Sequence, residues 1–178
     1  TKDSYILFLG RLVPEKGIRY LVEAFKNVKT DKKLVIAGGS SDTDSFMVEL
    51  KELAKDDDRI IFTGFVQGQM LDELYSNAYI YTLPSDLEGM PLSLLEAMSY
   101  GNCCLVSDIS ECTEVVDNKA LIFKKSDVDE LREKLQDACD HPEKVMEMKA
   151  QATDFICKKY NWDSVINETM KLYRRNNK

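Results

Sequence analysis

Residues 85–98 determine the architecture expected for this chain, and they read Ser85-Asp86-Leu87-Glu88-Gly89-Met90-Pro91-Leu92-Ser93-Leu94-Leu95-Glu96-Ala97-Met98. The apolar run 78–83 before them predicts a buried strand. Gly89 gives a flexible turn, and Pro91 suits the first position of a helix because its missing N–H would be unpaired there. We expect that helix to run to about Tyr100, with Gly101 as its C-terminal cap.

The helix start predicted here is suited to binding an anion. The first N–H groups of a helix have no partner within it, and the helix dipole favours negative charge there. We therefore expect the N–H groups near Leu92 and Ser93 to be available to a ligand. Glu96 lies within this helix among apolar neighbours, so its side chain is predicted to be buried. A buried carboxylate needs partners, because an unpaired buried charge is very costly.

Glu88 and Glu96 form a pair of acids around this helix start. One lies in the loop and one in the helix, so the two carboxylates can bracket a ligand whose phosphates sit between them. A structural reading fits the spacing equally well, with Glu96 paired to a basic residue and Glu88 solvated. Isolated acid pairs are common, so spacing alone does not decide between the two readings.

The composition is that of an ordinary globular domain. The 178 residues are 44% hydrophobic and 31% charged, so residues 1–178 are expected to form one α/β domain with its own core. The net charge of -7 argues against a broad nucleic-acid surface. No long apolar run or signal-peptide pattern is present, and the five cysteines indicate buried, reduced thiols in a cytoplasmic protein. Because the chain opens on Thr1 rather than Met, we expect it to be a domain cut from a longer protein.

Short apolar runs alternate with helical patterns along the whole chain. The runs predict six strands, at 5–9, 34–37, 59–62, 78–83, 103–106 and 120–123. The patterns between and after them predict helices at 17–25, 46–53, 69–76, 91–100, 113–116, 128–139, 142–158 and 162–175. This alternation predicts a Rossmann-like, doubly wound parallel sheet in the order 3-2-1-4-5-6, followed by C-terminal helices.

In this strand order the first and fourth strands are neighbours, and ligands bind beyond their carboxyl ends. The loops that meet there are 10–16 and 84–91, so Arg11 and Lys16 are expected beside the acid pair. Arginine can fork onto two phosphate oxygens and lysine supplies a point charge, so together they suit a diphosphate. The alternative is a surface loop in which either cation pairs with Glu15. Neither a P-loop nor a GxGxxG fingerprint is present.

Several motifs occur in order along nearly the whole chain: Gly10-Arg11, Lys16-Gly17, Phe62-Thr63-Gly64-Phe65, Glu88-Gly89-x-Pro91-Leu92-x-Leu94-Leu95-Glu96-Ala97-Met98, Glu114-Val115-Val116 and Tyr160-Asn161-Trp162. Together they resemble the C-terminal half of a glycosyltransferase family 4 enzyme. Such enzymes have the GT-B fold, in which two Rossmann-like domains face each other across a cleft. The resemblance implies that residues 1–178 are the donor-binding half and that the N-terminal acceptor domain is absent from this chain.

The resemblance implies a role for each matching charged residue. Arg11 and Lys16 match the cations on the donor diphosphate. Glu96 matches the acid that holds the ribose hydroxyls, since one carboxylate can accept hydrogen bonds from both. Glu88 matches the acid beside the donor sugar. Glu88, Arg11 and Lys16 are therefore expected to act in catalysis, with Glu88 orienting and stabilising rather than forming a covalent bond.

The remaining contacts implied by the resemblance are made largely by backbone and small residues, which bind the nucleotide and the sugar at Gly10, Gly38, Gly39, Gly64, Phe65, Gly89, Met90, Pro91, Leu92 and Ser93. The chain departs from the family at two of these positions. Pro91 stands where many relatives have glycine, which removes a backbone donor, and Ser93 replaces a frequent proline. Both departures concern fine donor geometry and leave the four charged residues in place.

The resemblance also implies the chemistry and the partners. A retaining enzyme would move a sugar from a nucleoside-diphosphate sugar, most often a UDP-sugar, to an acceptor sugar or a lipid-linked glycan. No metal and no cofactor are expected, and no nucleic acid. The isolated half is expected to bind donor but to transfer little or nothing. The full-length protein is expected in the cytoplasm, with scope for peripheral contact with the membrane.

Two other classes remain open at this stage. A different GT-B enzyme, such as a nucleotide-sugar epimerase or a phosphorylase, would share the fold and the phosphate chemistry. A flavodoxin-like or receiver-type binding module would instead need an acidic cluster at its strand ends.

Asp56-Asp57-Asp58 imitates a metal-binding DxD motif but precedes a strand, so we interpret it as a solvated turn. Asp42-Thr43-Asp44 is expected to cap the second helix.

Overall fold

The structure, a computed structural model, describes residues 1–39 and 44–175. Its centre is one six-stranded sheet in which all pairs are parallel and the order is β3-β2-β1-β4-β5-β6. The strands are β1 (Tyr5–Leu9), β2 (Lys33–Ala37), β3 (Ile60–Gly64), β4 (Ile80–Leu83), β5 (Cys103–Ser107) and β6 (Leu121–Phe123). This confirms the predicted Rossmann-like fold and its strand order.

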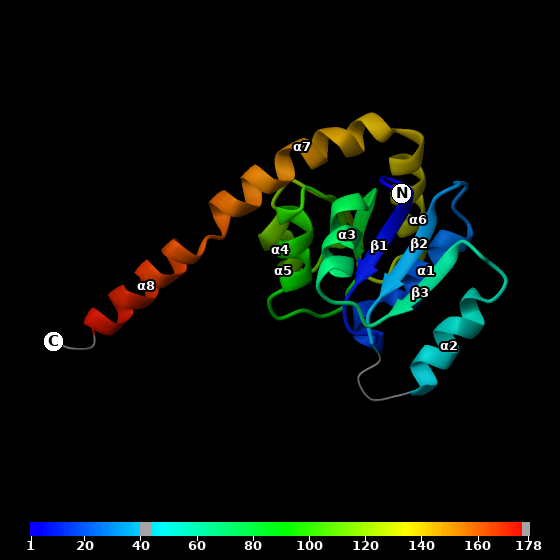
Figure 1. The fold of residues 1–178 in the computed structure, drawn as a ribbon, viewed down its shortest axis with the longest axis horizontal. Helices are drawn as coiled ribbons and strands as arrows, with labels where there is room; N and C mark the ends of the chain where they lie inside the picture. Colours follow the sequence, from blue (N-terminus) through cyan, green and yellow to red (C-terminus); the bar gives the residue numbers. More distant parts are fainter. Residues whose placement is uncertain (40–43, 176–178) are drawn as a thin grey trace.

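The helices follow the predicted alternation with the strands. They are the 3-10 helix η1 (Pro14–Lys16) and the α-helices α1 (Ile18–Lys26), α2 (Asp44–Ala54), α3 (Gln69–Asn77), α4 (Leu92–Ser99), α5 (Ser110–Val116), α6 (Val128–Asp140), α7 (Pro142–Lys159) and α8 (Trp162–Arg175). Helix α1 packs against α2 and α6, and α4 packs against α7. Figure 1 shows α8 projecting beyond the sheet and the helices that cover it. None of the described helices is long and apolar enough to cross a bilayer.

The start of helix α5 differs from the sequence expectation. Helix α5 begins at Ser110, three residues before the expected start at Thr113, because Ile109 is extended and acts as its N-cap. The cap proposed for α2 at Asp42 and Thr43 lies outside the described residues. The expected glycine at the end of α4 is confirmed, since Gly101 has φ of 76° and its N–H donates to the Met98 carbonyl at 3.0 Å.

Strands β1 and β4 lie at the centre of the sheet, and β5 pairs with β4. All residues of β4 and β5 are buried, as expected for parallel strands that are covered on both faces. β1 lies between β2 and β4, with Ile6 opposite Ile80 and Leu7 opposite Tyr81. Because β1 and β4 are parallel neighbours, their carboxyl ends lie at the same edge of the sheet. The loops that follow these strands therefore emerge next to each other.

Gly17 fixes how closely those two loops approach. Its φ is 65°, in the left-handed region, and a Cβ atom there would collide with the Pro84 carbonyl oxygen. The loop after β1 thus lies directly on the backbone that follows β4. Gly64 has a similar φ of 72°, but a Cβ atom at that position would meet nothing within 4 Å.

We expect Gly17→Ala to lower the free energy of unfolding by about 2–4 kcal/mol, because backbone strain and overpacking combine. The matched variant Gly64→Ala carries only the strain of the left-handed backbone, and should lose about 1 kcal/mol. Urea denaturation of both variants measures the difference. Equal losses would show that the contact between Gly17 and the Pro84 carbonyl does not constrain the loops.

The cysteines differ in their exposure, although all five are free thiols. Cys103, Cys104 and Cys112 are buried, whereas Cys139 is half-buried and Cys157 is exposed. Burial raises the pKa of the Cys103 and Cys112 thiols to about 12. The expectation of buried thiols is therefore correct for three positions and wrong for Cys157, which is exposed near the C-terminal end of α7.

The thiolate is the reactive form of cysteine, so iodoacetamide at pH 8 should modify Cys157 rapidly in the native protein. The three buried thiols should react only after denaturant is added, because burial keeps them protonated and inaccessible. Peptide mass spectrometry identifies the adducts, and Cys157→Ser should abolish the fast phase. Native labelling of Cys103 or Cys112 would contradict the burial described above.

Candidate functional site

The candidate site is formed where β1 and β4 end. It comprises the loop 10–17, the loop 84–91 and the first turns of α4, and we call it the β1–β4 site. The two strands are adjacent in the sheet, so their loops emerge side by side at the switch point of the doubly wound fold. The structure thus brings together the segments in which the sequence placed Arg11, Lys16, Glu88 and Glu96.

An ion pair between Lys16 and Glu88 joins the two loops. The ammonium Nζ lies 2.7 Å from each carboxylate oxygen, and the side chains are only 16% and 6% exposed. The structural alternatives are therefore wrong for both residues: Glu88 is not solvated, and Lys16 pairs with Glu88 rather than with Glu15. The reason is that β1 and β4 are neighbours, so the loop after β4 places the partly buried Glu88 carboxylate next to Lys16.

Asp86 holds the same two loops together from another side. Its backbone N–H donates to the Glu15 carbonyl at 2.8 Å. Its carboxylate accepts from the Tyr20 hydroxyl at 3.0 Å and from the Ser126 hydroxyl at 2.8 Å. Asp86 therefore links α1, the loop after β4 and the loop after β6. Sequence reasoning gave it no role, since its partners lie far away along the chain.

A second hydrogen bond to the Glu88 carboxylate comes from the Ser85 hydroxyl in the protein interior. This hydroxyl is fully buried and donates to Glu88 Oε1 at 2.6 Å, while the Ser85 carbonyl accepts from the Ser107 hydroxyl at 2.5 Å. Ser107 is also fully buried and ends β5. The Glu88 carboxylate is thus bonded to one cation and one buried hydroxyl.

Glu96 is exposed, so the expectation that it is buried is wrong. Helix α4 is apolar nearly all round, yet the sheet and α7 cover only part of it, and Leu92 is 63% exposed. The partner of Glu96 is also not basic. Its Oε2 accepts a hydrogen bond from the buried Tyr75 hydroxyl at 3.0 Å. Burial and the neighbouring carboxylate hold the pKa of Tyr75 far above its ordinary value, so the phenol remains a donor.

The start of α4 differs from the prediction at two residues. Pro91 is the N-cap and Leu92 is the first helical residue, because the N–H groups of Leu94 and Leu95 both donate to the Pro91 carbonyl. The Leu92 N–H is not available, since it donates to the Met90 carbonyl at 2.8 Å. The Ser93 N–H makes no hydrogen bond to any other described residue. One of the two expected anion donors therefore remains.

The Ser93 side chain belongs to a network of tyrosine hydroxyls. Its hydroxyl accepts from Tyr81 at 2.8 Å, and the Tyr81 hydroxyl also lies 3.2 Å from the Leu9 carbonyl. The Tyr75 and Tyr81 rings meet at 6.0 Å between centroids. Buried polar groups of this kind connect the ends of β1 and β4 to the first turn of α4.

The glycine positions named from the sequence lie at the ends of β1, β2 and β3. The Gly10 N–H donates to the Ala37 carbonyl, and the Gly38 N–H donates to the Gly64 carbonyl. Gly38 packs so closely on the Gly10 carbonyl that a Cβ atom would collide with it, and its φ is 149°. Gly39 accepts a hydrogen bond from the Leu12 N–H at 3.0 Å. These contacts hold together the backbone segments that follow β1, β2 and β3.

Two of the remaining predicted residues point outward at this end of the sheet. Phe65 follows β3 and is 76% exposed, and Arg11 is exposed in the loop after β1. Arg11 forms no ion pair with any other described residue, so the alternative in which it pairs with Glu15 is wrong. Gly89 and Met90 are also exposed in the loop before α4. All four residues are accessible to a ligand.

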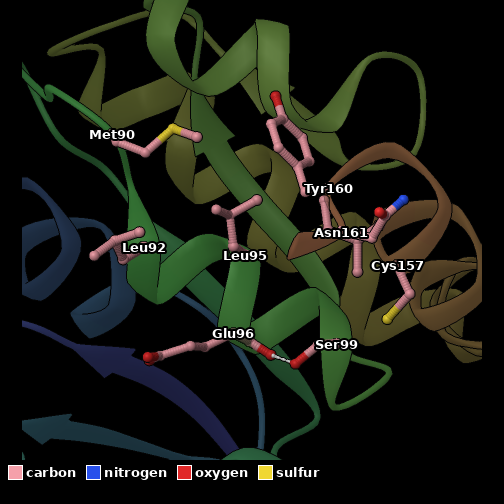
Figure 2. A pocket seen from close by; sticks show the side chains of 9 residues that line it. Met90, Leu92, Leu95, Glu96, Ser99, Cys157, Tyr160 and Asn161 are labelled. Carbon is pink, nitrogen blue, oxygen red and sulfur yellow. Dashed lines mark hydrogen bonds between the residues drawn. The ribbon is translucent and has the colours of Figure 1, made fainter. Parts of the chain in front are cut away.

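A cavity of about 510 Å³ lies beside the β1–β4 site. Its lining comes from α4, the loop before it and the C-terminal end of α7, as Figure 2 shows: Met90, Leu92, Leu95, Glu96, Ser99, Ile156, Cys157, Tyr160 and Asn161. Sequence reasoning named the α4 side of this cavity but not the α7 side, because no spacing signal connects residues so far apart. Among the described residues, no group of three acidic, histidine or cysteine side chains could hold a metal ion.

Comparison with known proteins gives the family. A family model described as glycosyl transferases group 1 matches residues 1–174. The chain belongs to the group 1 glycosyltransferases. An uncharacterized glycosyltransferase of Methanocaldococcus jannaschii is 29% identical over 97% of this chain, which spans 45% of that protein. The O-antigen chain mannosyltransferase B of Escherichia coli is 28% identical over 97% of the chain and 46% of its own length. The chain therefore spans about half the length of these relatives.

Solved structures show the same fold for this group 1 domain. The Anabaena protein HepE, crystallised with UDP and glucose, superposes with a TM-score of 0.90 at 15% identity, over 98% of this chain and 49% of that one. Sucrose-phosphate synthase of Thermosynechococcus elongatus gives a TM-score of 0.83 at 25% identity, over 97% of this chain and 45% of that one. The structural match confirms that this chain has the fold of about one half of each of these proteins.

We expect Lys16→Met to destabilise the domain by about 2–3 kcal/mol, because it leaves the buried Glu88 carboxylate without its cation. Adding Glu88→Gln to this variant should recover at least half of the loss, since the unpaired charge is then removed. Urea denaturation of the two single variants and the double variant completes the cycle. Additive losses would mean that the two side chains do not interact in solution.

Proposed function

We propose that this chain is the donor-binding half of a retaining glycosyltransferase that uses a nucleoside-diphosphate sugar. The observation that carries the proposal is the convergence of Lys16, Glu88 and the start of α4 at the ends of β1 and β4. This is the place where a doubly wound fold binds its ligand. Membership of the glycosyltransferase family supports the reaction class.

The diphosphate would be held by Arg11, Lys16 and the Ser93 N–H. Arg11 is exposed and free to fork onto two phosphate oxygens. Lys16 lies where its ammonium can turn from Glu88 towards a phosphate, while remaining close to the carboxylate. The helix start adds its dipole to these charges. Because two cations and a helix dipole can neutralise a diphosphate, we propose that the reaction needs no metal and no cofactor, and expect it to persist in EDTA.

The two acids would bind different parts of the donor. Glu96 is exposed, and only its Oε2 accepts the Tyr75 hydrogen bond. The carboxylate therefore has acceptor positions left for the two hydroxyls of a ribose. Glu88 lies deeper, beside Lys16, where the sugar attached to the diphosphate would lie. The base would meet Gly64 and Phe65 beyond β3. The other residues proposed to contact the nucleotide or the sugar are Gly10, Gly38, Gly39, Gly89, Met90, Pro91 and Leu92.

The chemistry follows from the charge that develops. Breaking the bond between sugar and phosphate leaves a positively charged sugar and adds negative charge to the leaving diphosphate. Arg11 and Lys16 would stabilise the diphosphate, and Glu88 would orient the sugar and stabilise its positive charge. Losing one such fixed contact typically raises the barrier by about 3 kcal/mol. The net configuration is proposed to be retained, as in the family that the sequence resembles.

The acceptor would be bound by a second domain that this chain does not contain. The chain spans about half of each related protein, which supports this proposal. Helix α8 carries the exposed apolar side chains Ile166, Met170 and Tyr173, and such a surface suits contact with another domain. We propose that the acceptor is a sugar or a lipid-linked glycan, that the isolated half transfers little, and that the whole enzyme works in the cytoplasm with peripheral membrane contact.

Isothermal titration of this chain with UDP, GDP and ADP should show that at least one nucleoside diphosphate binds. Glu96→Ala should weaken that binding by about tenfold or more, because a charged hydrogen bond to the ribose is lost. Glu88→Ala should weaken it much less, because a nucleotide without sugar has no group for Glu88.

Glu133→Ala provides the control, because that carboxylate is exposed on α6, away from the β1–β4 site. It should leave binding unchanged. Absence of binding at millimolar concentrations of all three nucleotides would refute the proposed function. Equal losses for Glu88→Ala and Glu96→Ala would refute the separate roles of the two acids.

A further inference from the structure

We propose that two buried hydroxyl groups, those of Ser85 and Tyr75, are positioning residues that hold the two acids for different parts of the donor. Ser85 would fix Glu88 for the sugar, and Tyr75 would fix Glu96 for the nucleoside. This inference rests on the proposed function, because it assigns a new task to two residues behind the proposed contacts. Neither hydroxyl would touch the donor itself.

Ser85 is built into the protein interior with its hydroxyl directed at Glu88. The residue is fully buried, and its carbonyl accepts from the buried Ser107 hydroxyl at the end of β5. A serine hydroxyl has one proton to give, and here that proton is donated to Glu88 Oε1 at 2.6 Å. The orientation of the Glu88 carboxylate is thereby tied to the sheet through β4 and β5.

The Ser85 bond differs from the Lys16 ion pair in one important respect. The Lys16 ammonium is carried on a long side chain with several rotatable bonds, and in the proposed function it turns towards the diphosphate when the donor binds. The Ser85 hydroxyl is enclosed, and within the described part of the chain its proton is donated only to Glu88. Glu88 therefore keeps one fixed hydrogen bond after it shares its cation, and its carboxylate stays aimed at the sugar instead of following Lys16.

Tyr75 does the same for Glu96 from a different element. It lies on α3 with 1% exposure, and its ring stacks on Tyr100 at 5.2 Å between centroids. Its backbone carbonyl accepts from the Asn102 side chain at 2.9 Å. Such a ring cannot move freely, so its hydroxyl, 3.0 Å from Glu96 Oε2, gives the exposed Glu96 side chain a fixed direction. A flexible glutamate held in one rotamer loses less conformational entropy when it binds a diol.

The roles of the two hydroxyls can be distinguished by comparing the affinity for a nucleotide with the affinity for its sugar conjugate. The probes are UDP with UDP-glucose and GDP with GDP-mannose, titrated calorimetrically into this chain and its variants. Ser85→Ala should reduce the affinity gained from the sugar by about tenfold, and leave the affinity for the nucleotide alone unchanged. Tyr75→Phe should weaken the nucleotide and its conjugate by the same factor, about five- to tenfold.

Matched controls distinguish positioning from a general effect on the structure. Thr82→Val removes a fully buried hydroxyl on β4 that has no hydrogen-bond partner among the described residues, and Tyr79→Phe removes a tyrosine hydroxyl that donates to the Ala138 carbonyl at 2.6 Å, away from the site. Both should retain the wild-type ratio of the two affinities. If Ser85→Ala does not fold, Ser85→Cys keeps the volume with a weak donor, and the same reduced sugar gain is expected.

Each result of these titrations either supports or overturns the inference about Ser85 and Tyr75. A selective loss of the sugar gain in the Ser85 variant, together with a uniform loss in Tyr75→Phe, supports the inference. Wild-type binding with an unchanged ratio in the Ser85 variant, or a Tyr75→Phe variant that behaves like Tyr79→Phe, overturns the inference and leaves the proposed function standing. Failure of the wild-type chain to bind either pair overturns both.

Discussion

The pairing of β1 with β4 is the constraint on which the rest of this structure depends. These strands are far apart in the sequence, yet they lie next to each other because the chain winds outward in both directions from them. Their loops therefore start side by side, and each supplies what the other lacks. The loop after β1 carries cations and the loop after β4 carries carboxylates, so opposite charges meet where two buried strands end.

The interior of the parallel sheet also explains the polar network beneath the site. Strands covered on both faces are dry, so a polar side chain at their end must find a partner within the protein. Ser85, Ser107 and Tyr81 satisfy this requirement through hydrogen bonds to one another's loops and to the start of α4. The same bonds that satisfy buried groups also fix the side chains that face outward. Stability and site geometry thus have a common origin in this domain.

The sequence predicted the fold almost completely, because apolar runs, helical periodicity and glycine turns are local signals that agree with one another. It also predicted which loops meet, because the doubly wound order chosen for six alternating strands makes the first and fourth strands neighbours. It did not predict the exposure of Glu96, which depends on how much of α4 the sheet and α7 leave uncovered. The partners Tyr75, Ser85 and Asp86 were missed for a similar reason, since a hydrogen bond between distant elements leaves no periodic trace.

The ion pair between Lys16 and Glu88 has a consequence for small competing anions. An inorganic phosphate ion that took the Lys16 ammonium for itself would leave the Glu88 carboxylate with the Ser85 hydroxyl but without its cation, and the two negative charges would repel. A larger ligand that combines phosphates with hydroxyl groups supplies donors to that carboxylate at the same time. If the proposed function holds, the pair would favour a phosphate ester that carries hydroxyl groups over free phosphate, because the carboxylate has to be satisfied whenever its cation is withdrawn.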